Sequence, residues 1–180
     1  MSERAKAGCH ALDAATDAEA RAMLTRACGS SRWVDRMMAR RPFGSDARLL
    51  RTARIEWFGL TEVDWLEAFS QHPRIGDRAL AAPKLPSEGG ALAARFPATH
   101  DLSAQEQAGV GGAHDDVLRA LAEANQAYLD RFGFIFIVCA TGKTAEEMLA
   151  LLRARLPNDR ATELRFAAEE QARITALRLS

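Results

Sequence analysis

Helix-start signals recur along this chain, and they limit its fold more than any other feature of the sequence. Each signal is a Ser or Thr followed within three positions by Asp or Glu, as at Thr16, Ser45, Thr61 and Thr144. Such a hydroxyl accepts a backbone N–H of the first helical turn, and a nearby carboxylate interacts favourably with the helix dipole. Gly29 and Gly59 follow two of the expected helices and mark their ends.

Apolar residues at helical spacing follow these signals and predict helices over most of the chain. The expected helices cover about 17–28, 31–40, 46–58, 62–69, 115–131, 145–156 and 159–180, with another helical start at Ser103. Only Phe132–Ala140 favours a strand by propensity. A lone strand has no partner, so this stretch is either the start of a buried helix or an extended segment in the core. The sequence predicts one all-α domain over 1–180, a bundle of about seven or eight helices with a long irregular loop after residue 72.

Composition narrows the class of protein. The 180 residues are 48% hydrophobic, which suits one domain with a sizeable core. Lys and Arg number 24 and Asp and Glu also 24, so the balanced charge disfavours a nucleic-acid partner. The longest apolar run, Phe134–Ala140, is far shorter than the roughly 20 residues of a membrane span. Three widely spaced cysteines with no CxxC pair, and the lack of a secretory leader, favour the cytoplasm, and no zinc-site spacing is present.

His72 is the first candidate for chemistry, because it stands immediately before Pro73. Proline disfavours the α conformation in the residue before it, so the preceding helix must end there. The imidazole then lies at or just past a helix C-terminus, where the carbonyl dipoles favour the imidazolium form. That form can donate a proton. The pattern fits either a catalytic acid or a histidine that only caps the helix.

Ser103-Ala104-Gln105-Glu106 is the second candidate, and it also has two interpretations. It fits the capping box that begins an ordinary helix. A helix N-terminus also presents free N–H groups to an anion. Glu106 and Gln107 in this turn can bind a substrate that is rich in amide groups.

Arginines along the last two expected helices, interleaved with glutamates, indicate solvated helix faces. The arginines are Arg153, Arg155, Arg160, Arg165 and Arg173, and the glutamates are Glu163, Glu169 and Glu170. Arg178, which stands between Leu177 and Leu179, leaves a more buried role open.

A series of short motifs, in order along the chain, resembles the 2-oxo-4-hydroxy-4-carboxy-5-ureidoimidazoline (OHCU) decarboxylases of urate degradation. The motifs are Arg41-Pro42-Phe43, Trp65-Leu66-Glu67-Ala68-Phe69, His72-Pro73-Arg74-Ile75-Gly76-Asp77, Ser103-x-x-Glu106-Gln107, Asn125-x-x-Tyr128, Phe132-Gly133-Phe134-x-Phe136-Ile137, Arg155-Leu156-x-Asn158, Glu163-Leu164 and Ile174-x-x-Leu177-Arg178-Leu179. They cover the chain from about residue 12 to 179. Each motif is weak alone, but the ordered set with a matching length is specific.

The resemblance implies an all-helical enzyme, usually a homodimer, that needs no metal or organic cofactor and converts OHCU into (S)-allantoin by loss of CO2. It implies that His72 protonates the carbon left by CO2 and that Glu106 is the second catalytic residue. The implied substrate-binding residues are Pro73, Ser103, Gln107, Phe136, Ile137, Val138, Ala140 and Arg178, with Arg155 as the alternative arginine. The alternative function is a non-catalytic helical module of the same fold that binds a related ureido compound.

Overall fold

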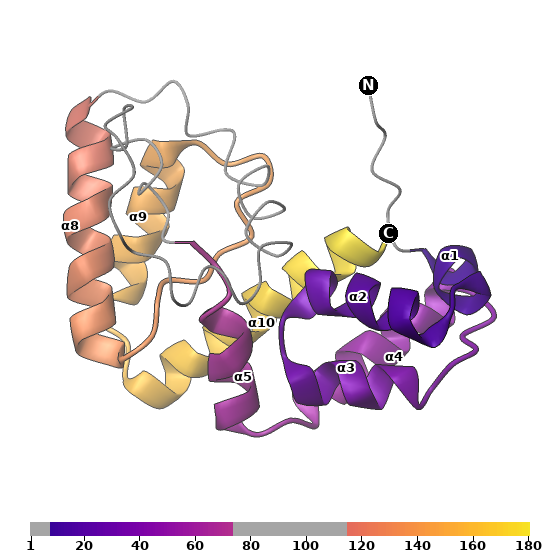
Figure 1. Ribbon diagram of the computed structural model, residues 1–180. Helices are drawn as coiled ribbons and strands as arrows, with labels where there is room; N and C mark the ends of the chain where they lie inside the picture. The colour runs from indigo at the N-terminus through magenta and orange to yellow at the C-terminus, as the bar shows by residue number, and fades with distance from the viewer. Residues whose placement is uncertain (1–7, 74–114) are drawn as a thin grey trace, which may run out of the picture. The chain divides into compact units, whose positions relative to one another are not determined.

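The computed structural model describes residues 8–73 and 115–180, which form eight helices and no strand. The helices are α1 (Cys9–Ala14), α2 (Asp17–Cys28), α3 (Ser31–Met38), α4 (Asp46–Phe58), α5 (Glu62–Phe69), α8 (Asp115–Phe132), α9 (Ala145–Arg155) and α10 (Arg160–Leu179), labelled in Figure 1. The all-α prediction is therefore confirmed. The irregular loop expected after residue 72, from residue 74 onward, and the helical start at Ser103 lie outside the described residues.

The predicted caps hold these helices at their N-termini. The side chains of Thr16, Ser45 and Thr144 accept the backbone N–H three residues ahead, at 3.4, 3.3 and 3.2 Å respectively. Thr61 instead donates its N–H and its hydroxyl to the Asp64 carboxylate, at 3.0 and 2.7 Å. Helix α1 was not expected from the sequence and has no side-chain cap of its own. Asp46, at the start of α4, accepts the Cys9 N–H at 2.7 Å, so a tertiary contact supports α1.

The described chain forms two compact units. One comprises residues 8–68 and 171–180, and the other comprises 69–73 and 115–170. In the first unit α2 packs on α3, α3 packs on α4, and α1 packs on both α2 and α4. Its largest fully buried side chains are Trp33, Trp57, Phe43, Leu12, Leu24, Met37 and Leu49. No helix within the described ranges is both long enough and apolar enough to cross a bilayer.

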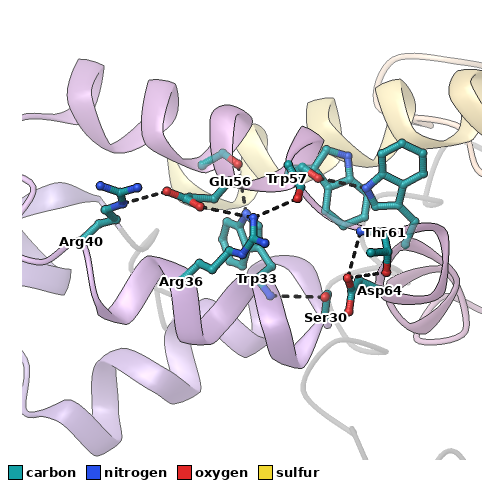
Figure 2. A network of polar contacts seen from close by, with 11 residues as sticks. Ser30, Trp33, Arg36, Arg40, Glu56, Trp57, Thr61 and Asp64 are labelled. Atoms are coloured by element: carbon teal, nitrogen blue, oxygen red, sulfur yellow. Dashed lines mark hydrogen bonds and ion pairs between the residues drawn. The ribbon is translucent and has the colours of Figure 1, made fainter.

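Indole and carboxylate groups join α3, α4 and α5 in the first unit, as Figure 2 shows. The indole N–H of Trp33 donates to the Ala53 carbonyl at 3.0 Å, and that of Trp65 donates to the Trp57 carbonyl at 3.0 Å. Glu56, which is 7% exposed, accepts from Arg40 Nε at 2.8 Å. Because buried polar groups are costly without partners, these bonds hold the three helices in one arrangement.

The second unit is built around α8 and α9, which pack together, and the first half of α10. Helix α8 ends at Phe132, and Gly133 follows in a left-handed conformation with φ of +78°. A side chain rarely adopts that conformation, so glycine suits this turn out of the helix. The residues from 135 to 140 then form neither helix nor strand. Of the two alternatives for Phe132–Ala140, the non-helical core segment is therefore the one observed.

Candidate functional site

His72 lies three residues beyond the end of α5, where the sequence places it. Its N–H donates to the Phe69 carbonyl at 3.1 Å, which closes a turn at the helix C-terminus. His72 and Pro73 are both partly buried.

An aromatic cluster joins the end of α5 to the segment after α8. The Phe69 ring lies 5.6 Å from the ring of Phe134, and Phe134 lies 5.9 Å from Tyr128. Tyr128 also packs against Phe132 at 4.6 Å and against Phe136 at 5.3 Å. Rings at these separations attract one another beyond their area of burial. The turn that carries His72 is therefore anchored, through Phe69, to the segment that contains Phe136–Ala140.

Some polar groups of the Phe136–Ala140 backbone form hydrogen bonds with side chains, and others have no partner among the described residues. Arg155 donates to the Ile137 carbonyl at 2.9 Å, Glu170 accepts the Cys139 N–H at 2.7 Å, and Lys143 Nζ donates to the Cys139 carbonyl at 2.8 Å. Among the described residues, none accepts the backbone N–H of Ile137, Val138 or Ala140. These three residues are only 2, 7 and 6% exposed. Buried N–H groups are nearly always paired in proteins, so this segment can bind a ligand that carries acceptors.

Arg155 does not lie on a solvated helix face, and that expectation was wrong for both Arg155 and Glu163. The Arg155 side chain is 12% exposed and that of Glu163 is 0% exposed. The guanidinium donates to the carboxylate through Nε at 2.6 Å and also pairs with it through a second nitrogen. A buried carboxylate is stable only with such a partner, because desolvation penalises an isolated charge.

Two further donors complete the surroundings of the Glu163 carboxylate. The Tyr128 hydroxyl donates to it, and Asn158 Nδ2 donates at 2.8 Å. Burial raises the pKa of Tyr128 far above its ordinary value of 10.0, against the opposing charge of Arg155. Tyr128 therefore keeps its proton and remains a donor. We call Tyr128, Arg155, Asn158 and Glu163 the Arg155 cluster.

Arg178 belongs to the first unit, where it is 8% exposed. It donates to the carbonyls of Arg26 and Ala27, at 3.4 and 3.3 Å, at the C-terminal end of α2. A cation at this position interacts favourably with the helix dipole. The buried role that the sequence left open for Arg178 is thus observed, with helix carbonyls as partners.

The remaining expected site residues are only partly covered by the structure. Ser103, Glu106 and Gln107 lie outside the described residues. Pro73, Phe136, Ile137, Val138 and Ala140 all lie in the second unit with His72. In residues 8–73 and 115–180, no group of three or more His, Cys, Asp or Glu side chains is placed to hold a metal ion.

The sequence predicted a solvated position for Glu163 and no functional role for either Glu163 or Tyr128, although both stand in the motifs that carry the resemblance. One signal was present in the sequence. Arg155 and Glu163 stand on opposite sides of the Pro157-Asn158 break, so a helical hairpin brings them together. Tyr128 is also the only tyrosine of the chain.

Comparison with known proteins shows which family the chain resembles. The model of the OHCU decarboxylase family matches residues 13–180. The uric acid degradation bifunctional protein TTL of Arabidopsis thaliana is 40% identical over 154 residues, which are 85% of this chain and 44% of that protein. The uric acid degradation bifunctional protein PucL of Bacillus subtilis is 30% identical over 151 residues, 83% of this chain and 27% of that protein. This chain thus spans less than half the length of these two curated relatives.

A solved structure agrees with this result. The crystal structure of an OHCU decarboxylase in the presence of (S)-allantoin matches with a TM-score of 0.69 and 36% sequence identity. The match covers 88% of this chain and 94% of that one. The resemblance first noted from short motifs therefore extends over nearly the whole chain and its fold. The chain belongs to the OHCU decarboxylase family.

Proposed function

We propose that this chain decarboxylates OHCU to (S)-allantoin in urate degradation, with His72 as general acid. The observation that carries the proposal is the Phe136–Ala140 segment, a buried stretch with backbone N–H groups that lack acceptors among the described residues. It lies in the same unit as His72, whose turn is anchored to it through the contact of Phe69 with Phe134. Family membership and the relatives in uric acid degradation support the same reaction.

The reaction requires that the protein hold the substrate in place and deliver one proton to it. The bond between the ring carbon and the carboxylate carbon breaks, CO2 leaves, and the electron pair passes into the adjacent ring imine. The His72 imidazolium then gives its proton to the neighbouring ring carbon, which carries the ureido group, and becomes neutral imidazole, which regains a proton from solvent. The hydroxyl on the carbon that lost CO2 passes its proton to the ring nitrogen as that carbon becomes a carbonyl. Because the substrate itself accepts the electrons, the protein needs no separate electron sink. General acid catalysis by such a group contributes about 10²–10⁴-fold.

The remaining expected residues have roles that follow from their chemistry. The N–H groups of Ile137, Val138 and Ala140, which have no acceptor in residues 8–73 and 115–180, would donate to carbonyl oxygens of the ureido group and the ring. Pro73 would fix the approach of His72, and Ser103, Glu106 and Gln107 would bind the amide-rich parts of the substrate. Glu106 is the second catalytic residue in this proposal. Arg178 would bind the substrate carboxylate.

We further propose that the chain forms a homodimer in the cytoplasm, and that it needs neither a metal nor an organic cofactor. A small-molecule substrate, and neither nucleic acid nor a membrane, is its expected partner. The balanced charge supports this choice, because a protein that binds nucleic acid usually carries a basic surface.

The test is the decay of freshly generated OHCU followed by circular dichroism, which reports the handedness of the allantoin formed. The wild-type protein should accelerate the decay and produce only the S enantiomer. His72→Asn removes the proton donor with a side chain of similar size and should lower kcat about 10²–10⁴-fold. His10→Asn is the matched control, because His10 is exposed in α1, and it should leave kcat unchanged.

A second measurement separates the enzyme from the non-catalytic alternative. A ligand-binding module would bind (S)-allantoin yet leave the decay of OHCU at its uncatalysed rate. Glu106→Ala should weaken allantoin binding in either case. Turnover at the wild-type rate by His72→Asn would remove His72 from the mechanism.

A further inference from the structure

The Arg155 cluster holds one peptide group of the proposed substrate-binding segment. Arg155 Nη1 donates to the Ile137 carbonyl at 2.9 Å, and the guanidinium carbon lies 4.7 Å from the centre of the Phe136 ring. The guanidinium thus contacts the segment through a hydrogen bond and through the face of an aromatic ring. Both contacts fall directly before Val138.

The Ile137 carbonyl and the Val138 N–H belong to the same peptide group. A trans peptide is planar, and its carbonyl and N–H point in opposite directions. The only cis bond among the described residues is Arg41–Pro42. Fixing the Ile137 carbonyl therefore fixes the direction of the Val138 N–H, which has no acceptor among the described residues.

Glu163 sets the orientation of the guanidinium. Its carboxylate accepts from Arg155 Nε at 2.6 Å and pairs with a second nitrogen, while Nη1 donates to the Ile137 carbonyl. The planar fork of arginine permits these contacts at once, whereas a lysine ammonium cannot reproduce that geometry. Asn158 and Tyr128 hold the carboxylate from other sides.

We infer that Arg155, oriented by Glu163, is a positioning residue that aims the Val138 N–H at the ligand by holding the Ile137 carbonyl. This inference rests on the proposed function. It also assigns Arg155 a role different from that of an arginine that binds the substrate carboxylate.

The two roles predict different effects on substrate and product. OHCU carries the carboxylate that is lost, and (S)-allantoin does not, but both carry the ureido group and the ring. If Arg155 aims a backbone N–H at shared groups, its replacement weakens both ligands. If it binds the carboxylate, its replacement weakens OHCU alone.

The experiment measures the KM for OHCU and the inhibition constant of (S)-allantoin for wild type, Arg155→Lys and Glu163→Gln. We expect both constants to rise in parallel by about 2- to 10-fold, the effect of one misdirected hydrogen bond. The Val138 amide resonance should also shift in the ¹H–¹⁵N spectrum of each variant. Should Arg155→Lys fail to fold, Glu163→Gln carries the same test, because it disturbs the same guanidinium.

Two controls separate positioning from a loss of stability. Arg153→Lys makes the same change two residues earlier in α9, at an exposed position, and should alter neither constant. Trp33→Phe removes the buried bond from the indole to Ala53 in the other unit, so it should lower stability and leave both constants unchanged.

The outcomes are distinct. A rise in KM with an unchanged allantoin constant overturns the inference, because Arg155 would then bind the carboxylate. Unchanged values of both constants in an active protein overturn it as well, while the proposed function stands. If the wild type neither accelerates OHCU decay nor binds allantoin, the proposed function itself fails.

Discussion

Removing both charges of the Arg155–Glu163 pair should destabilise the protein less than the sum of the two single removals. Arg155→Met leaves the Glu163 carboxylate buried with the neutral donors of Tyr128 and Asn158. Glu163→Leu leaves the guanidinium buried with the Ile137 carbonyl. Breaking a buried ion pair by removing one partner costs about 3–5 kcal/mol. The two single costs therefore add up to about 6–10 kcal/mol.

The double variant should cost less than this sum. It leaves no buried charge, but Tyr128 and Asn158 lose an acceptor and the Ile137 carbonyl loses a donor, at about 1–3 kcal/mol each. We expect the double variant to fall short of the sum by about 2 kcal/mol, whereas independent sites add within about 0.5 kcal/mol.

The assay is urea unfolding followed by far-ultraviolet circular dichroism. Helical signal comes from both units, whereas all three tryptophans, Trp33, Trp57 and Trp65, lie in the first unit. Tryptophan fluorescence would therefore miss local unfolding around the pair. Additive costs in the double variant, or single costs below about 1 kcal/mol, would show that the pair is not a coupled buried charge pair.

Three further predictions concern single residues. Burial by itself raises the pKa of the Asp13 carboxyl. The backbone N–H groups of Gly44 and Phe43 donate to this carboxylate and outweigh burial, so the pKa of Asp13 lies below its ordinary value of 3.8. Its contribution to stability is therefore full well above pH 3.8 and is lost as the pH falls through the lower folded pKa. The free energy of unfolding of Asp13→Asn should fall at neutral pH and change less than that of wild type between about pH 5 and about pH 2. Thr144→Ala removes the cap of α9 and should cost about 0.5–2 kcal/mol in thermal unfolding, whereas Thr144→Ser keeps the acceptor and should cost less. Burial raises the pKa of Cys28 to about 12, so mass spectrometry after iodoacetamide treatment at about pH 8 should find partly exposed Cys139 labelled and Cys28 unlabelled.

Each of these has a result that contradicts it. Equal acid sensitivity of Asp13→Asn and wild type would show that this carboxylate does not contribute to acid unfolding. Equal stability of Thr144→Ala and Thr144→Ser would show that the cap hydrogen bond does not stabilise α9. Labelling of Cys28 as fast as Cys139 would show that the folded protein opens around that thiol.

Local interactions made most of the helices predictable. The caps at Thr16, Ser45 and Thr144 act over three residues, so their partners are visible in the sequence itself. The turn at His72 was predictable for the same reason, because Pro73 restricts its neighbour directly. Helix α1 was missed because Asp46, which is 37 positions away, supports its first residue.

The burial of Arg155 was decided by the tertiary structure alone. An arginine in a helix that also carries glutamates has the same sequence pattern whether it faces solvent or a buried carboxylate. Its side-chain partners, Tyr128 and Glu163, come from the end of α8 and the start of α10, and Asn158 in the turn after α9 donates to Glu163. Only the packing of these elements excludes water from the pair. Phe136–Ala140 is similar, because its propensity for a strand could not be satisfied without a partner strand. One side chain of α9 and one of α10, and not a sheet, bind two of its backbone polar groups. The sequence by itself thus determined which residues form helices, and long-range contacts decided which charged and backbone groups became buried.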